Sequence, residues 1–291
     1  MSENRLDAPR VIRDPGSLRE MVGKVRREGR TIGLIPTMGA LHEGHLSLVR
    51  RGVSECDFTV VTIFVNPTQF GPREDFARYP RSLDTDLALL AKERANLVFA
   101  PEADTMYPEG FSTHVEPPSV AGPLEGEFRP GHFRGVVTIV LKLFHLIAAD
   151  VAYFGQKDYQ QARVIQDMAR DLNVAVKINV CPIVREADGL ALSSRNRYLN
   201  SRERARARSL YLALQRAVQL ASRGQRVAQT IRDEMRAVLV AGGVTEIEYA
   251  TLVDPRTLLP VDTVTVDTMA LIAARVGATR LIDNCRIGGD S

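Results

Sequence analysis

The sequence predicts an α/β protein: a Rossmann-like, doubly wound parallel sheet with a second, smaller C-terminal α/β domain. Two observations support this fold class. Short apolar or β-branched runs alternate with stretches of helical periodicity as far as residue 185, which is typical of parallel strands joined by helices. Beyond residue 185, two long helical patterns come first and strand patterns follow. We therefore expect a first domain at residues 1–185 and a second at residues 186–291.

The elements of the first domain follow from local signals. A first helix is expected to begin at Asp14 or Ser17, either of which can cap it, and to end at Gly29. The run FTVVTIFV at residues 58–65 is rich in β-branched residues and is typical of a buried parallel strand. The other expected elements of this domain are strands at residues 31–36, 96–100, 151–154 and 174–180 and helices at residues 44–56, 83–95, 136–149 and 159–172.

The second domain is expected to place its helices before its strands. Helical periodicity covers residues 202–223 and 227–241, and strand patterns follow at residues 246–253 and 270–276. Within the first domain, residues 122–133 (GPLEGEFRPGHF) combine several glycines and prolines and therefore predict a loop.

Composition and charge exclude several classes of protein. The 291 residues are 45% apolar and 25% charged, as in ordinary folded domains. Lys and Arg (38) nearly balance Asp and Glu (35), and the arginine-rich residues 201–208 lack interleaved aromatics, so nucleic acid is not an expected partner. No apolar run suits a membrane span or an export signal. Cys56, Cys181 and Cys285 lack CxxC spacing and indicate reduced thiols in the cytoplasm.

The stretch PTMGALHEGH at residues 36–45 predicts a phosphate-binding site. It follows an expected strand and leads into a helix, which places it at the sheet edge where ligands of open α/β folds bind. A helix N-terminus offers unpaired N–H groups to an anion, and Gly39 and Gly44 allow the backbone to approach closely. His42 and His45 can donate hydrogen bonds to phosphate oxygens and stabilise charge that develops on them.

Three other interpretations of the two histidines are weaker. A zinc pair would need further His or Cys ligands, and the spacing is not that of HExxH. A purely structural role is usual for a lone histidine, but here two occur in a glycine-bearing turn after a strand. A Walker-type phosphate loop requires GxxxxGK[ST], which the sequence lacks.

Four segments together resemble a known family. The pattern His42-Glu43-Gly44-His45 resembles the HxGH signature with which the nucleotidylyltransferase superfamily binds ATP. It is followed by FVNPTQFGPREDFARYPR at residues 64–81, FGQKDYQQ at residues 154–161 and READGLALSSRNRYL at residues 185–199. In this order and spacing the segments closely resemble the pantothenate synthetases, also called pantoate–β-alanine ligases.

The resemblance implies a two-step, ATP-dependent ligation. Pantoate attacks the α-phosphorus of ATP to give pantoyl adenylate and diphosphate, and the amine of β-alanine then displaces AMP to form pantothenate, a coenzyme A precursor. It further implies Mg²⁺ on the triphosphate, a cytoplasmic homodimer, and a C-terminal domain that closes over the active site and takes little part in the chemistry. The implied partners are small molecules, with no nucleic acid and no membrane.

The resemblance also implies which residues handle ATP. Lys157 is suited, as a compact charge, to the departing phosphates, whereas Asp158 either contacts the nucleotide sugar or caps a helix. The implied catalytic residues are His42, His45, Lys157, Ser193, Ser194 and Arg195. The implied nucleotide-binding residues are Pro36, Thr37, Met38, Gly39, His42, Gly44, His45, Gly155, Gln156, Lys157, Asp158, Val184, Leu192, Ser193, Ser194 and Arg195.

Neutral side chains are implied to bind the acid substrate. Gln69 and Gln161 match the family's pantoate-binding pair, with Gln69 also near β-alanine, since an amide donates and accepts without adding charge. Met38 is also implied to bind the substrate. Asn66 either touches the substrate or forms an Asx-type turn before Pro67.

Acidic and loop residues complete the candidates. Asp86 is favoured over Asp84 as a Mg²⁺ ligand, although a carboxylate at a helix start explains either residue equally well. Tyr79, Arg129 and His132 are further loop candidates, with a structural or lid role as the alternative.

Three other functions remain as alternatives. A nucleotidylyltransferase acting on a phosphorylated acceptor would need a cationic acceptor pocket, whereas Gln69 and Gln161 are neutral. An RNA-binding relative of aminoacyl-tRNA synthetases would need a basic domain, whereas the chain is nearly neutral. A nucleotide sensor without catalysis would not need the complete set of phosphate-binding side chains.

Overall fold

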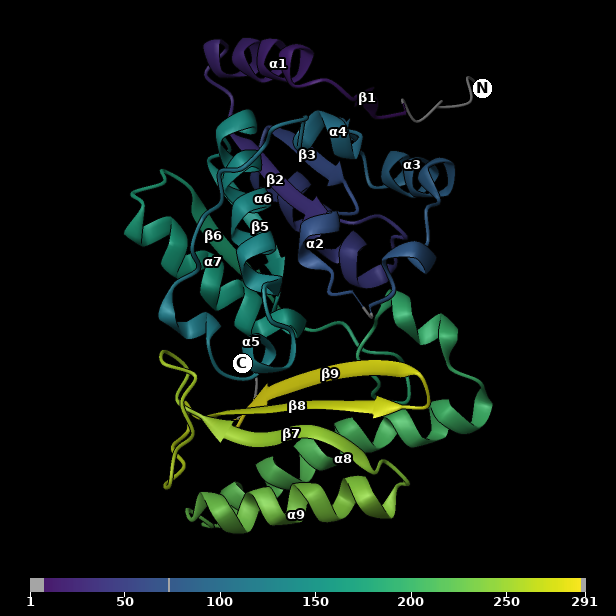
Figure 1. Ribbon diagram of the computed structural model, residues 1–291, viewed down its shortest axis with the longest axis vertical. Helices are drawn as coiled ribbons and strands as arrows, with labels where there is room; N and C mark the ends of the chain where they lie inside the picture. Colours follow the sequence, from purple (N-terminus) through teal and green to yellow (C-terminus); the bar gives the residue numbers. More distant parts are fainter. Residues whose placement is uncertain (1–7, 73, 289–291) are drawn as a thin grey trace. The chain divides into compact units, whose positions relative to one another are not determined.

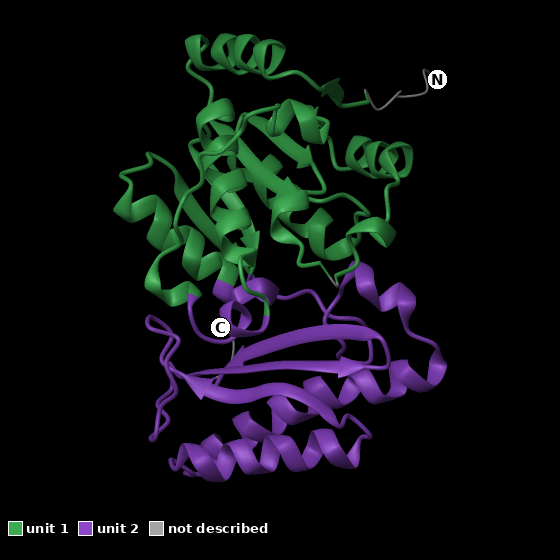
Figure 2. Cartoon of the chain, viewed as in Figure 1, with its two compact units in different colours: residues 1–121, 129–155, 161–181 green, residues 122–128, 156–160, 182–291 purple. Residues whose placement is uncertain are grey.

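The computed structural model describes residues 8–72 and 74–288 (Figure 1). They form two compact units (Figure 2). The first unit runs to residue 121 and adds residues 129–155 and 161–181, and the second contains residues 122–128, residues 156–160 and the chain from residue 182. A single division was expected after residue 185, but residues 122–128 and 156–160, two short segments of the expected first domain, belong to the second unit. Residues 1–7, part of the N-terminus that lacks a signal-like apolar core, lie outside the described residues.

The first unit contains a six-stranded sheet in the order β1-β4-β3-β2-β5-β6, with every neighbouring pair parallel (Figure 1). Its strands are β1 (Arg10–Ile12), β2 (Ile32–Thr37), β3 (Phe58–Ile63), β4 (Leu97–Phe99), β5 (Val151–Gly155) and β6 (Lys177–Cys181). The central strands are almost wholly buried, as expected where helices cover both faces. The predicted Rossmann-like sheet is confirmed. The pattern missed β1, because a three-residue strand is too short to show a period.

Helices cover both faces of this sheet. They are α1 (Pro15–Arg27), α2 (Glu43–Glu55), α3 (Leu83–Lys92), α6 (His132–Ile147) and α7 (Tyr159–Asp171). Because parallel crossovers are right-handed, the strand order places α2 and α3 on one face and α1, α6 and α7 on the other. The packing of α2 against α3 and of α1 against α6 agrees with this arrangement.

The strand order reverses between β2 and β5, and this reversal places the candidate site. The chain passes from β2 to β3 in one direction and from β5 to β6 in the other, while Gly33 of β2 pairs with Val151 of β5. The carboxyl ends of both strands therefore lie at the same edge of the sheet. The chain continues from β2 into Met38 and from β5 into Gln156. Such a reversal point is where open α/β sheets bind ligands.

The loop predicted at residues 122–133 is correct only at residues 122–124 and 129–131, since the stretch also contains α5 (Glu125–Phe128) and the start of α6. Helix α6 begins at His132 directly after Gly131, whose φ of 82° is left-handed, so glycine here starts the helix rather than a loop. Glu125 is 6% exposed and tied by tertiary contacts, which outweigh the local glycine and proline signals. The remaining short helices are η1 (Pro67–Gln69), η2 (Phe76–Arg78), α4 (Ala103–Met106), η3 (Ser119–Ala121), η4 (Gln156–Asp158) and η5 (Ser194–Tyr198).

The second unit contains a three-stranded antiparallel sheet in the order β7-β8-β9. Its main elements are α8 (Ser201–Ser222), α9 (Ala228–Ala241), β7 (Glu246–Val253), β8 (Met269–Val276) and β9 (Thr279–Arg286). Helix α8 packs on β8 and β9, and α9 packs on β7, around a core that includes Leu214, Met235 and Ile272. The sequence pattern missed β9, because charged residues such as Arg280 and Asp283 interrupt its alternation. Among the described residues, no helix combines the length and the apolar character needed to cross a membrane.

Candidate active site

The turn between β2 and α2 carries the HxGH pattern and is held by a buried carboxylate. Gly39 and Ala40 are left-handed, with φ values of 81° and 50°. Asp86 is 1% exposed, and its two carboxylate oxygens accept the backbone N–H groups of Ala40 at 2.9 Å and of Leu41 at 2.8 Å. A Cβ atom on Gly39 would lie 3.1 Å from the same carboxylate. Glycine and Asp86 together therefore hold this turn in shape.

The two histidines lie side by side at the start of α2. His42 is the N-cap residue, and its Nδ1 accepts the N–H of Gly44 at 3.2 Å. Since that nitrogen accepts a hydrogen bond, a neutral His42 carries its proton on Nε2. The rings of His42 and His45 have centroids 4.1 Å apart and planes inclined by 33°. Two imidazoles thus accompany the N–H groups of a helix N-terminus, where an anion is favoured.

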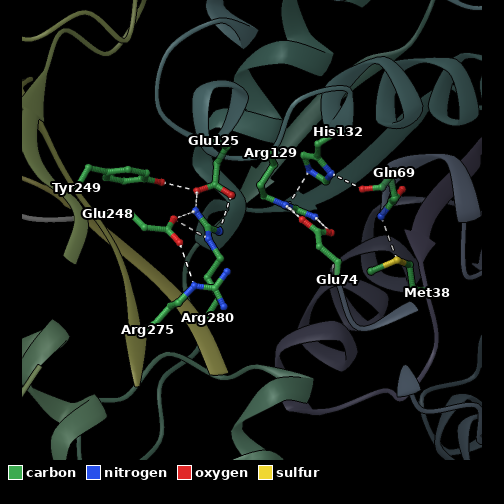
Figure 3. Close-up of polar contacts among 10 residues, drawn as sticks. All are labelled: Met38, Gln69, Glu74, Glu125, Arg129, His132, Glu248, Tyr249, Arg275 and Arg280. Atoms are coloured by element: carbon green, nitrogen blue, oxygen red, sulfur yellow. Dashed lines mark hydrogen bonds and ion pairs between the residues drawn. The ribbon is translucent and has the colours of Figure 1, made fainter. Parts of the chain in front are cut away.

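Gln69 lies beside this turn (Figure 3). Its Nε2 lies 3.0 Å from Sδ of Met38, and its Oε1 accepts a hydrogen bond from Nδ2 of Asn66 at 3.1 Å. Asn66 is 1% exposed, and its Oδ1 accepts the N–H of Thr68 and the hydroxyl of Tyr107, at 3.3 and 2.8 Å. Asn66 therefore makes the Asx-type turn contact and also orients Gln69. Three of the predicted substrate-binding residues are brought together here.

Of the loop candidates, His132 contacts the backbone of the same turn, and Arg129 contacts His132. Nδ1 of His132 lies 2.8 Å from the carbonyl oxygen of Gln69, and its Nε2 lies 3.0 Å from Nη1 of Arg129. Arg129 also donates to both carboxylate oxygens of Glu74, at 2.6 and 2.8 Å (Figure 3). Sequence reasoning did not single out Glu74. The charged run Arg-Glu-Asp within residues 64–81 could have indicated Glu74 as a candidate.

In the second unit, the chain after β5 is tied to β9. The carbonyl oxygens of Gln156 and Lys157 both accept from Nδ2 of Asn284 at 3.0 Å, and Asn284 is 1% exposed. The Lys157 ammonium lies 3.8 Å from Oδ2 of Asp158, and the Lys157 side chain is 21% exposed. The backbone of this segment is therefore fixed while its lysine stays accessible.

The serine-rich segment of the second unit forms a capped turn. Oγ of Ser193 accepts the N–H of Arg195 at 3.2 Å and caps η5, and Ser194 is buried. The N–H of Leu192 donates to the carbonyl of Val184 at 3.0 Å, which joins the two predicted nucleotide-binding positions that flank residues 185–191. The backbone that carries Ser193 and Arg195 is thus itself held by hydrogen bonds.

The predicted site residues divide between the two units. Those in the first unit are Pro36, Thr37, Met38, Gly39, His42, Gly44, His45, Asn66, Gln69, Asp86, Gly155 and Gln161. Those in the second unit are Gln156, Lys157, Asp158, Val184, Leu192, Ser193, Ser194 and Arg195. Gln161 lies in α7, half-buried, and no hydrogen bond joins it to Gln69 within the described part of the chain.

A second polar network, which sequence reasoning missed, lies in the second unit (Figure 3). Arg280 donates to both oxygens of Glu125, at 2.7 and 2.6 Å, and to Glu248 at 2.8 Å. The hydroxyl of Tyr249 donates to Glu125 at 2.6 Å, and burial together with this carboxylate raises the pKa of Tyr249 well above its ordinary value. The register of β7 shifts after Ile247, and this bulge lets two successive residues reach one network.

The contacts of Asp86, the expected Mg²⁺ ligand, support a different role for this residue. Within residues 8–72 and 74–288, no group of three or more His, Cys, Asp or Glu side chains is arranged to hold a metal ion. Both carboxylate oxygens of Asp86 accept backbone N–H groups, and Asp84 is exposed in the first turn of α3. This engagement favours a positioning role for Asp86 over a metal-ligand role.

The parallel sheet and the HxGH turn at its reversal point define a nucleotide-using α/β enzyme. The family model described as "Pantoate-beta-alanine ligase" matches residues 10–286. The chain belongs to this family.

Individual relatives agree with the family assignment. A pantothenate synthetase of Roseiflexus castenholzii is 55% identical over 254 residues, which cover 87% of this chain and 91% of that protein. The crystal structure of pantothenate synthetase from Thermus thermophilus has a TM-score of 0.91 at 43% identity and covers 96% of this chain and 99% of that one. Pantoate-β-alanine ligase from Francisella tularensis, solved with "Beta-gamma ATP and Beta-alanine", has a TM-score of 0.80 at 32% identity, with 97% and 99% coverage.

Proposed function

We propose that this protein, a ligase that forms a carbon–nitrogen bond, condenses pantoate with β-alanine to pantothenate through a pantoyl adenylate, using ATP. The observation that supports this function is the contact of Gln69 with Met38 beside the turn that carries the two histidines. The neutral amide of Gln69 is suited to a hydroxylated acid, and its position beside this turn supports the assignment of His42 and His45 to the phosphates of ATP. A phosphorylated acceptor, the alternative, is not favoured, because it would require cationic groups at Gln69.

The first step is an attack by the substrate itself. A carboxylate oxygen of pantoate bonds to the α-phosphorus, the bond from that phosphorus to the bridging oxygen breaks, and diphosphate leaves. His42 donates from Nε2 to an oxygen of the α-phosphate as negative charge develops, and His45 supports it from the adjacent position. No covalent nucleophile from the protein is needed. Alignment of the two reactants can contribute about 7–11 kcal/mol at best.

The second step forms the amide. The amine of β-alanine attacks the acyl carbon, the bond from that carbon to the phosphate oxygen breaks, AMP leaves and the nitrogen loses a proton. Gln69 and Gln161 hold the pantoyl group through its hydroxyl and carbonyl oxygens. Lys157, Ser193, Ser194 and Arg195 bind the β- and γ-phosphates in the first step, in which Lys157 acts as a point charge.

Mg²⁺ belongs to the proposal as the partner of the triphosphate, where it would neutralise charge on the leaving diphosphate. Among the residues that the structure describes, the donor set does not favour a dedicated metal site, since the carboxylate of Asp86 already accepts two backbone N–H groups. We assign the ion's ligands to phosphate oxygens and water, which Mg²⁺ commonly retains.

The proposal also describes a cytoplasmic homodimer. Cys56 and Cys181 carry free thiols, as suits a reducing compartment. Light scattering of the purified protein tests the dimer directly, and a mass corresponding to one chain would contradict it.

The experiment that tests the function is exchange of labelled diphosphate into ATP, without β-alanine and with or without pantoate. Exchange that depends on pantoate is the expected result, because only adenylate formation is reversible in this way. Exchange without pantoate, or none with it while ATP still binds, would reject the proposed acid substrate.

Replacing His42 by alanine is predicted to lower kcat by about two to three orders of magnitude, the effect of losing one preorganised donor to a developing charge. The measurement is steady-state release of AMP, with circular dichroism to establish folding. His114→Ala, an exposed histidine, is the matched control. Unchanged turnover in folded His42→Ala would contradict the role of His42.

A further inference from the structure

Three side chains form a continuous polar path to the main chain of Gln69 (Figure 3). Glu74 accepts two hydrogen bonds from Arg129, Arg129 contacts Nε2 of His132 at 3.0 Å, and Nδ1 of His132 lies 2.8 Å from the Gln69 carbonyl oxygen. The side chains of Arg129 and Glu74 are 16% and 23% exposed, and His132 is 7% exposed. The path is therefore largely screened from solvent. In this partly buried environment each of its hydrogen bonds is stronger than it would be at the surface.

The donors and acceptors of this path allow one neutral form of His132. A guanidinium has only N–H donors, so Nε2 of His132 must accept the bond from Arg129. A backbone carbonyl only accepts, so Nδ1 must carry the proton and donate it to Gln69. A neutral imidazole satisfies both contacts only as the Nδ1–H tautomer. A doubly protonated ring would direct a second N–H group at the guanidinium.

Glu74 keeps the path oriented. Burial alone would raise the pKa of Glu74, but the hydrogen bonds and the charge of Arg129 outweigh it, so the pKa of this carboxyl lies below its ordinary value. The ionised carboxylate holds the guanidinium in a two-point, fork-like geometry. With two of its donors directed at Glu74, Arg129 is fixed so that Nη1 faces His132.

The first turn of α6 also packs closely against η1, the turn that carries Gln69. A Cβ atom on Gly135 would lie 2.3 Å from the carbonyl oxygen of Thr68, so the helix and η1 meet backbone to backbone. Asn66, which bonds the amide of Gln69, also donates to the carbonyl of Gly135 at 3.2 Å. The main chain of Gln69 is thus held from α6 at His132, and its side chain through Asn66.

We propose that Glu74, Arg129 and His132 are positioning residues that set the backbone of Gln69, and with it the direction of the Gln69 amide toward pantoate. This inference rests on the proposed function, in which Gln69 binds pantoate. None of the three residues needs to touch the substrate. Their substitution is expected to affect the binding of pantoate, whereas other residues bind ATP.

Substitutions of His132 separate positioning from a general structural role. The amide nitrogen of asparagine can replace Nδ1 as donor, whereas that of glutamine reaches the place of Nε2. His132→Ala and His132→Gln are expected to raise the KM for pantoate about tenfold, with the KM for ATP within about twofold, as for the loss of one hydrogen bond. His132→Asn is expected to restore the pantoate KM to within about threefold. His145→Ala, an exposed histidine on the same helix, is the control.

Three results would overturn the positioning role while leaving the proposed function intact. The first is an unchanged pantoate KM in a folded His132→Ala. The second is an equal KM for pantoate in His132→Asn and His132→Gln. The third comes from the unaltered protein: nitrogen-15 NMR of its histidines should show the Nδ1–H tautomer for His132, and an Nε2–H tautomer or a charged ring would reject the path. Absence of pantoate-dependent exchange in the unaltered protein would instead reject the function, and with it the role of Gln69.

Discussion

Two guanidinium–carboxylate networks that begin near each other in the sequence end differently. In the second unit, Arg280 bonds Glu125 and Glu248, and Tyr249 bonds Glu125, so that side chains satisfy one another. In the first unit, Arg129 bonds Glu74 and also contacts His132, whose other ring nitrogen reaches a backbone carbonyl. We call the network of Arg280 closed, because its carboxylates and guanidinium bond one another, and that of Arg129 open, because its contact with His132 can transmit orientation to the main chain.

The two networks are expected to have different effects on the protein, one on stability and the other on substrate binding. Burial tends to lower the pKa of Arg280, but hydrogen bonds and charge from Glu125 and Glu248 raise it above its ordinary value. The closed network is therefore expected to contribute mainly to stability. The open network, which ends at Gln69, is expected to contribute mainly to substrate binding.

The largest expected effect is a loss of stability when Arg280 is removed from the closed network that it forms with Glu125 and Glu248. Arg280→Leu leaves Glu125 buried without its ion pair, and should lower the free energy of unfolding by about 3–5 kcal/mol. Urea denaturation measures it. The matched control is Arg275→Leu, whose side chain is 46% exposed and lies 3.5 Å from Glu248, and which should cost at most about 1 kcal/mol. Equal losses in the two variants would remove the distinction between buried and exposed pairs.

Gly135→Ala should have an intermediate effect and should act on both stability and binding. The added methyl overlaps the carbonyl of Thr68, and overpacking of this kind typically costs about 1–3 kcal/mol. The displaced turn should also raise the KM for pantoate. Gly23→Ala in α1, where the nearest atom is 3.5 Å away, should instead stabilise by up to about 1 kcal/mol. A Gly135→Ala variant with an unaltered pantoate KM would show that the turn tolerates the shift.

The smallest effect is the pH dependence contributed by Glu74. Its folded-state pKa is lowered, so its stabilisation is fully present above the unfolded pKa of about 4.3 and is lost as the pH falls through the folded value. The stability difference between the unaltered protein and Glu74→Gln should therefore be constant near neutral pH and shrink below about pH 4. Denaturation series at several pH values test this, with the exposed Glu109→Gln as control. A difference that grows toward acid would contradict the assigned direction.

Much of the fold could be predicted because its signals are local. Five strands of the parallel sheet, the main helices and the turn at residues 36–45 follow from periodicity, capping residues and glycines that act over a few neighbours. The pairing of Gln69 with Met38 could not be predicted in this way, although both residues were candidates. Met38 follows β2 and Gln69 lies in η1 after β3, and only the pairing of these two strands brings the residues together.

The sequence by itself determined the class of sheet, the HxGH turn after β2 and the family to which the chain belongs, because each depends on residue types in a short, ordered pattern. The tertiary structure alone decided that Asp86 holds the backbone of Ala40, 46 residues away, and that Glu74 pairs with Arg129 across 55. It also decided that residues 125–128 form a helix, since Glu125 pairs with Arg280 at a separation of 155 residues. Sequence periodicity does not identify the partner of a charged side chain, because the two residues pair only when folding removes both from water.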